Sequence, residues 1–326
     1  MTPAAKRQRT RILLAFAAVY LIWGSTYLFI KYGIETIPPF MLGASRFAVA
    51  GGLLYGLAVW RGAKHAGARD LRLAMITGVL MLGMGNGAVM WAEQTVASGI
   101  VALIVSAVPI MIVLIDWLRP RGVRPKNAVF LGLALGFIGM IVLIGPRAII
   151  GEGHVDEVGA AVLLIGCTSW ALGSILTRGK SGTASPLVFS ALQMLAAGGA
   201  MLVASLAFRE PSGFSVSGVS AKSAWSWVYL ALAGSVVGYT AYVYLLGTVS
   251  ATKASTYAYV NPIIAVVLGW AFANEPIGAR TLVAAAIILG GVALITMQQS
   301  ASVHPTGEHP VPAPEPGGGA RERNAA

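Results

Sequence analysis

Charged side chains are scarce in this chain of 326 residues. Lys, Arg, Asp and Glu together make up 11% of it, whereas soluble globular domains carry about 25%. Hydrophobic residues reach 56%, and the mean hydropathy is +0.75. A water-soluble fold of this size could not cover so apolar a core with so few charges. The composition therefore excludes a soluble protein and predicts an integral membrane protein.

The residues that carry most metal, redox and cofactor chemistry are also rare. The one cysteine, Cys167, allows no internal disulfide and no CxxC motif, and the four histidines are not spaced as metal pairs. No GxxxxGK[ST] phosphate-binding loop occurs, and no pair of carboxylates lies deep in an apolar stretch. These absences argue against an enzyme, a metal site, a cofactor and direct use of ATP.

Long apolar runs dominate what remains. A bilayer core requires about 20 apolar residues per helix, and we count ten such stretches, with the first retained as a helix and not cleaved as a signal peptide. After Gln299 a Pro- and Gly-rich tail begins, and we expect 299–326 to be disordered and cytoplasmic. The predicted helices cover 12–31, 39–60, 73–92, 97–117, 127–145, 157–177, 184–208, 223–246, 253–273 and 279–297.

An internal repeat organises these helices. WGSTYLFIK from Trp23 matches WALGSILTR from Trp170 at an offset of 147, and a second register of 153 places Pro109 on Pro262. We therefore predict two five-helix halves, 12–145 and 157–297. Because five is odd, the second half is inverted relative to the first. Inverted repeats are typical of secondary transporters, whose substrate site lies near the midplane between the halves.

The positive charges indicate the orientation. If the N-terminus is cytoplasmic, 17 of the 23 Lys and Arg residues lie on cytoplasmic segments, five lie outside and Arg46 lies within a helix. The positive-inside rule then predicts that both termini are cytoplasmic. The net charge of +11 thus reflects membrane orientation and gives no reason to expect nucleic-acid binding. The partners we expect are the lipid bilayer and a small-molecule substrate, with the chain as a monomer or a homodimer.

Several segments resemble a known family. IWGSTYLFIKYGIETIPPFMLGASRF (22–47), GNGAVMWAEQTVASGIVALIVSAVP (85–109), SWALGSIL (169–176) and YAYVNPIIAVVLGW (257–270) resemble the EamA-type permeases of the drug/metabolite transporter superfamily, and within them the YedA-like inner-membrane proteins. The resemblance implies ten helices in two repeats, a multi-pass location in the bacterial inner membrane, and export of amino acids, other metabolites or drugs. The family often has a Glu after the fourth helix of each repeat; here Glu275 matches, whereas Arg119-Pro120 occupies the first half.

Polar and aromatic residues inside the helices are the candidates for a cavity. An arginine at membrane depth is costly and usually faces water or a partner, so Arg46 could hold a carboxylate; alternatively it pairs with Glu93 or helix-end carbonyls. Gln193 is its repeat equivalent. The cavity candidates are Arg46, Trp23, Ser25, Asn86, Glu93, Trp170, Gln193, Tyr239, Tyr257 and Asn261.

Each candidate also has a structural interpretation. Glu93 could bind a proton or an ammonium, or could be an interfacial carboxylate. Trp23 and Trp170 could stack on a substrate or pack the halves together. Pro109 and Pro262 interrupt their helices and could act as kinks during alternating access or as static bends. An importer or exchanger of organic solutes, and a membrane scaffold or sensor without transport, are the alternative functions.

Overall fold

The computed structural model describes residues 3–119, 124, 127–144, 156–178, 184–249, 254 and 257–301. Within these ranges every regular element is a helix, as the apolar pattern predicts. The elements are α1 (Pro3–Gly33), α2 (Pro39–Trp60), α3 (Ala68–Gly78), η1 (Val79–Asn86), α4 (Gly87–Ala92), α5 (Ser98–Val105), α6 (Val108–Leu118), α7 (Asn127–Ile144), α9 (Glu157–Arg178), α10 (Pro186–Ala207), η2 (Glu210–Gly213), η3 (Val216–Gly218), α11 (Ala221–Tyr229), η4 (Leu230–Tyr239), α12 (Thr240–Thr248), α14 (Tyr257–Ala273) and α15 (Ala279–Ala301).

Seven helical segments are long and apolar enough to cross a membrane. Three shorter apolar helices cover Asn127–Gly139, Val260–Ala273 and Ala279–Leu294. Each of the ten predicted stretches is thus helical over most of its length. Helix α15 continues to Ala301, so it extends into the predicted tail; residues 302–326 lie outside the described part of the chain. The seven long segments are Lys6–Gly33, Pro39–Trp60, Ala68–Ala92, Ser98–Leu118, Glu157–Thr177, Pro186–Ala207 and Ala221–Thr248.

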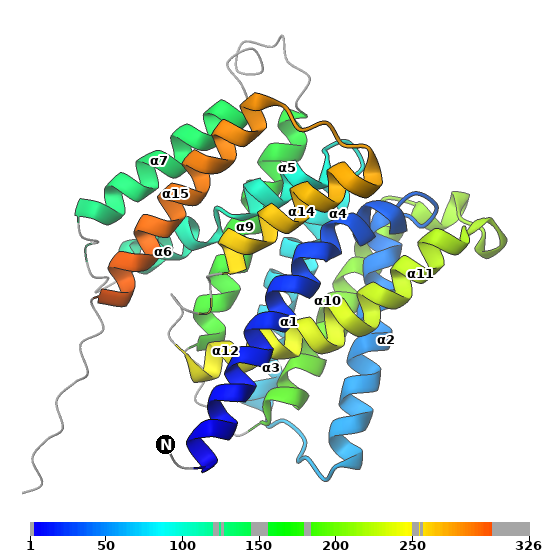
Figure 1. The fold of residues 1–326 in the computed structure, drawn as a ribbon. Helices are drawn as coiled ribbons and strands as arrows, with labels where there is room; N and C mark the ends of the chain where they lie inside the picture. Colours follow the sequence, from blue (N-terminus) through cyan, green and yellow to red (C-terminus); the bar gives the residue numbers. More distant parts are fainter. Residues whose placement is uncertain are drawn as a thin grey trace, which may run out of the picture.

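Repeat-equivalent helices pack as pairs. Helix α2 runs along α10, and α7 runs along α15 at one edge of the bundle (Figure 1). Helix α1 packs on α14 and on the segment from α11 to α12, whereas its counterpart α9 packs on the segment from α3 to α4 and on α5 and α6. Each half therefore sends its first helix into contact with the other half.

Two glycines set the close approach of α2 and α10. A Cβ on Gly51 would lie 3.0 Å from the Ala191 carbonyl oxygen, and one on Gly198 would lie 3.1 Å from the Ala48 backbone nitrogen. Gly51 and Gly198 are equivalent at the offset of 147. Small residues at such crossings let two backbones meet, so this pair of helices forms a tight and symmetric contact.

Two π-helical segments, η1 and η4, interrupt the third helix of each half. They end at Asn86 and Tyr239, positions that correspond at the offset of 153. Both segments contain glycines, and each packs against a tryptophan of the other half: a Cβ on Gly85 would lie 3.0 Å from Trp170 Cε3, and one on Gly238 would lie 2.6 Å from Trp23 Nε1. Wide π-helical turns are frequent at functional sites.

Carboxylates from one half cap helices of the other. Neither α2 nor α5 has a capping side chain at its own N-terminus. The Glu210 carboxylate accepts hydrogen bonds from the backbone N–H of Phe40 and Met41, and Glu275 accepts from those of Ser98 and Gly99 at 2.7 and 3.1 Å. These bonds satisfy N–H groups that a helix leaves unpaired at its start. Glu275 therefore serves a capping role here.

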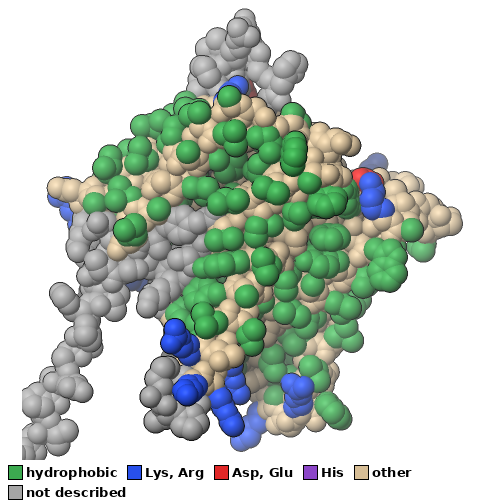
Figure 2. Space-filling view, viewed as in Figure 1, with side chains coloured by type: hydrophobic (Ala, Val, Ile, Leu, Met, Phe, Trp, Pro, Cys, Tyr) green, Lys and Arg blue, Asp and Glu red, His purple; other side chains and the backbone are tan. Residues whose placement is uncertain are grey.

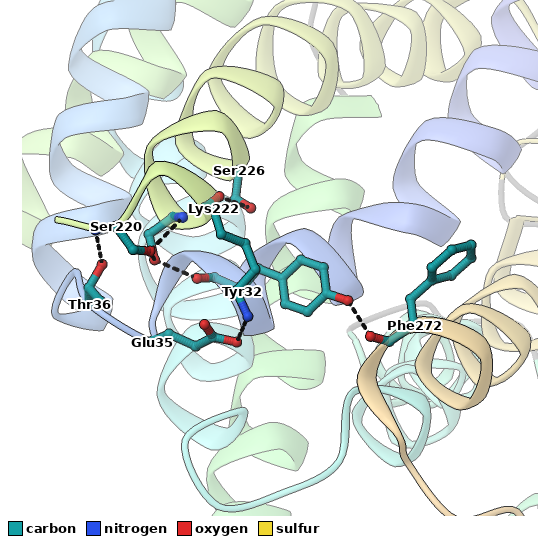
Figure 3. A network of polar contacts seen from close by, with 8 residues as sticks. Tyr32, Glu35, Thr36, Ser220, Lys222, Ser226 and Phe272 are labelled. Carbon is teal, nitrogen blue, oxygen red and sulfur yellow. Dashed lines mark hydrogen bonds and ion pairs between the residues drawn. The ribbon is translucent and has the colours of Figure 1, made fainter.

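Further polar contacts join the same end of the bundle. Figure 3 shows the C-terminal end of α1 bound to the start of α11 and to the end of α14. Lys222 Nζ forms an ion pair with Glu35 at 2.5 Å, and Tyr32 donates a hydrogen bond to the Phe272 carbonyl. On the opposite end, Lys and Arg side chains gather where α1 begins, while hydrophobic side chains cover the flanks in the view of Figure 2.

The two prolines that we predicted as kinks occupy different local structures. Pro109 is the second residue of α6, just after an interruption at Ser106 and Ala107 that separates α6 from α5. Pro262 lies inside α14. The fourth helix of the first half is thus divided before its proline, whereas α14 continues through its own.

Candidate functional site

A cavity lies between the two halves, at the level of η1 and η4. The volume that the centres of water molecules can occupy in it is about 70 Å³. Because one water requires about 10–15 Å³ of this volume, the cavity has room for several waters. Helices α1, α2, α4, α5, α6, α9 and α14 also contribute to its walls. Of the predicted candidates, those lining it are Trp23, Arg46, Asn86, Trp170, Tyr239, Tyr257 and Asn261.

Arg46 is the one charged side chain among the residues lining this cavity. It is 3% exposed, and its Nη2 donates a 2.6 Å hydrogen bond to Asn86 Oδ1. Its guanidinium carbon lies 4.3 Å from the centre of the Phe47 ring, while its Nε is buried without a hydrogen-bond partner. A guanidinium has five N–H donors, so Arg46 keeps capacity for an acceptor in the cavity. Within the described residues it forms no ion pair with Glu93.

Aromatic rings form the other wall of the cavity. The repeat-equivalent Trp23 and Trp170 meet edge to face, with ring centroids 5.7 Å apart. Tyr242 and Tyr257 both lie within 5.4 Å of the Trp23 ring centroid, and Tyr239 lies 6.5 Å from Trp170. Trp23 donates to the Gly234 carbonyl at 3.2 Å, but the indole N–H of Trp170 is buried without a partner. Among the described residues, the two repeat-equivalent indoles thus differ in their hydrogen bonding.

Ser25 and Gln193 do not line the cavity. Ser25 donates to the Ile22 carbonyl at 2.8 Å and contacts the Tyr229 hydroxyl at 2.7 Å. It lies two residues after Trp23, and on a helix this spacing turns its side chain about 200° away from that of Trp23. Gln193 is fully buried and donates to Thr77 Oγ1 at 2.7 Å and to Thr177 Oγ1 at 3.4 Å. Both side chains therefore connect helices, and the repeat position of Gln193 does not give it the environment of Arg46.

Glu93 lies just after α4, outside the set that lines the cavity. Its side chain is 0% exposed, and neither carboxylate oxygen has a hydrogen-bond partner. Lys31 Nζ donates instead to the Glu93 backbone carbonyl at 3.1 Å. Val89, one helical turn earlier, does line the cavity. Both interpretations considered for this carboxylate, a proton or ammonium site and an interfacial carboxylate, stay predictions.

The sequence analysis missed several residues of this site. Tyr27 and Thr26 of α1 and Cys167 of α9 line the cavity, and Tyr242 completes the aromatic cluster at 1% exposure. Tyr242 lies three residues after Tyr239 and Tyr27 four residues after Trp23, so helical spacing could have identified both. Cys167 carries no polar pattern that would have indicated its location.

Comparisons with known proteins agree with this architecture. The model of the EamA-like transporter family matches the chain twice, over residues 10–145 and 157–297. The chain is 36% identical over 299 residues to the inner membrane transporter YedA of Escherichia coli strain K12, a match that covers 89% of this chain and 92% of that protein. It is 24% identical over 295 residues to the transporter YvbV of Bacillus subtilis strain 168, covering 90% and 94%.

A solved structure shares the fold. A crystal structure superimposes with a TM-score of 0.63 at 20% identity, over 88% of this chain and 98% of that one. The family and the named relatives are transporters and not enzymes. With both halves of the chain matching the family model and with an inner-membrane relative at 36% identity, this chain belongs to the EamA-like transporter family.

Proposed function

We propose that this protein is a secondary transporter that exports small carboxylate-bearing metabolites, such as amino acids or related compounds, by alternating access. In this proposal all ten helices cross the bacterial inner membrane as two inverted five-helix repeats, and both termini face the cytoplasm. The twofold family match and the symmetric packing of η1 and η4 support the repeat. The basic side chains where α1 begins support the orientation.

Arg46 carries the substrate assignment. Its guanidinium is buried in the cavity with one hydrogen bond and no ion pair among the described residues. A cation at this depth is strongly disfavoured unless an anion or water meets it, and a carboxylate would satisfy two of its donors at once. The tryptophan and tyrosine rings would contact the apolar remainder of the substrate.

Counterflow in proteoliposomes tests this function. Vesicles preloaded with an unlabelled amino acid should accumulate the labelled form through the wild-type protein, across a panel of amino acids. Arg46→Ala should reduce this uptake at least tenfold, because the bidentate contact is lost. Arg61→Ala, which changes an exposed arginine at the end of the same helix, is the matched control. Normal counterflow by Arg46→Ala protein that elutes as a folded species would contradict the assignment.

A further inference from the structure

Glu93 is the carboxylate that the proposed function does not use. It is completely buried beside the outer end of the cavity, and both of its oxygens lack hydrogen-bond partners. An ionised carboxylate in such a place is strongly disfavoured, and buried unpaired groups of this kind require an explanation. The neutral, protonated form removes that penalty. Burial alone would favour a permanently neutral group.

The charged neighbours oppose that tendency. Lys31 Nζ from α1 is held against the Glu93 backbone carbonyl. Arg46 from α2 lines the cavity together with Val89, whose carbonyl accepts the Glu93 backbone N–H one helical turn later. The negative charge of Glu275, in the connection after α14, opposes ionisation of Glu93. The Glu275 carboxylate also accepts hydrogen bonds from the N-terminus of α5. Tyr27 of α1 lines the same cavity as Arg46 and Val89. Two cations thus favour ionisation, while burial and one carboxylate favour the proton.

From this arrangement we propose that Glu93 is a proton-binding site whose occupancy is linked to the substrate at Arg46. The inference rests on the proposed function, because it needs an anion at Arg46. When a carboxylate binds Arg46, it cancels one of the two positive charges that stabilise ionised Glu93. Glu93 then takes up one proton from water while the carboxylate is bound. Release of the carboxylate restores the field of Arg46 and returns the proton to water.

Lys31 connects this proton to the closure of the outer end. Its ammonium joins α1 to the end of α4, which belong to the two sets of helices centred on α1 and α9. Ionised Glu93 attracts Lys31 and favours this contact, whereas protonated Glu93 weakens it. The proton therefore favours opening of the end at which both residues lie.

Infrared titration of the purified protein tests the proton site without any substrate. The wild type should show a protonated carboxyl band that persists above the pH at which an exposed glutamate ionises, and Glu93→Gln should lack it. Glu35→Gln, which removes an exposed carboxylate, should retain the band, and Lys31→Met should shift its titration to higher pH. An unchanged band in folded Glu93→Gln protein would overturn the proposal.

Transport measurements with the same variants test the linkage. For the amino acid with the fastest wild-type counterflow, affinity should be at least fivefold higher at pH 6 than at pH 8. In Glu93→Gln, substrate affinity measured by equilibrium binding to the folded, purified protein should change less than twofold over the same pH interval. A wild-type pH response in folded Glu93→Gln would overturn the linkage. Absence of counterflow in the wild type would instead contradict the proposed function and leave the infrared result to decide the proton site.

Discussion

At the scale of single residues, environment and not repeat position decides what a side chain does. Arg46 and Gln193 correspond in the two halves, yet Arg46 lines the cavity whereas Gln193 donates hydrogen bonds to two buried threonine hydroxyls. Gln193 even leaves its own Oε1 without a partner. The two halves are therefore alike in backbone and unlike in chemistry, which suits a site that recognises the two ends of one substrate differently.

Replacement of Gln193 by leucine should be well tolerated. The volumes are similar, and Thr77 keeps its hydrogen bond to the Leu73 carbonyl, so we expect stability to change by less than about 1 kcal/mol. Counterflow should remain within twofold of wild type. Thermal unfolding and transport assays check this, and a tenfold loss of transport in a stable variant would show that Gln193 contacts the substrate.

At the scale of elements, the π-helical segments and their tryptophans join the halves. Gly85 receives Trp170, and Gly238 receives Trp23, so each wide turn accommodates an indole from the opposite half. The first residues beyond these segments continue as α-helix. Because η1 and η4 lie between α-helical segments of the same helices, they form the junction at which each third helix meets the indole of the other half.

Gly238→Ala should destabilise the protein by about 1–3 kcal/mol, as overpacking does in well-filled cores. The new methyl would meet Trp23 Nε1 at 2.6 Å and displace the ring from the aromatic cluster. Gly52→Ala is the matched control, because nothing lies within 4 Å of its Cβ position. Thermal unfolding followed by tryptophan fluorescence measures both variants, and equal melting temperatures would contradict the packing described here.

The start of α9 gives a pH-dependent prediction. Thr95 donates to Asp156 Oδ2 at 2.5 Å, and this bond, with backbone N–H donors, lowers the pKa of the Asp156 carboxyl. The Thr95–Asp156 hydrogen bond therefore stabilises the fold at neutral pH, and this stabilisation is lost as the pH falls through the lowered pKa of Asp156. Thr95→Val should destabilise the protein by under about 1 kcal/mol at pH 7. The difference from wild type should shrink towards pH 3, whereas Thr10→Val should show no such trend.

At the scale of the whole molecule, the chain is a membrane bundle with intertwined halves. Helices α1 and α9 each pack mainly on the opposite half. Carboxylates of the second half cap α2 and α5 of the first. Rigid-body motion of one half against the other would separate α1 and α9 from the helices on which they mainly pack, so we expect the moving units to be the sets of helices centred on α1 and on α9.

Cysteine labelling tests the proposed orientation, aided by the burial of Cys167. In intact cells, a membrane-impermeant maleimide should label Ser217→Cys, which lies at the end opposite the start of α1. It should label Ala68→Cys only after permeabilisation. Both positions are exposed. The reverse labelling pattern would invert the topology.

The sequence by itself determined that the chain is a membrane protein, where its helices lie and how its two halves correspond. Apolar runs, glycines and paired tryptophans can be recognised from residue type and from spacing along single helices. Seven of the ten residues predicted for a cavity line the one described above, since polar and aromatic groups inside such runs are conspicuous.

Only the tertiary structure decided which of those polar residues share a space. The partners of Ser25 and Gln193 come from Tyr229 and Thr77, far along the chain, and no spacing rule predicts such a pairing. The same holds for Glu93, whose carboxylate is left unpaired by the way α1, α2 and α4 come together. Its carboxyl group is buried because packing excludes water from it, and this exclusion depends on helices that are distant in the sequence.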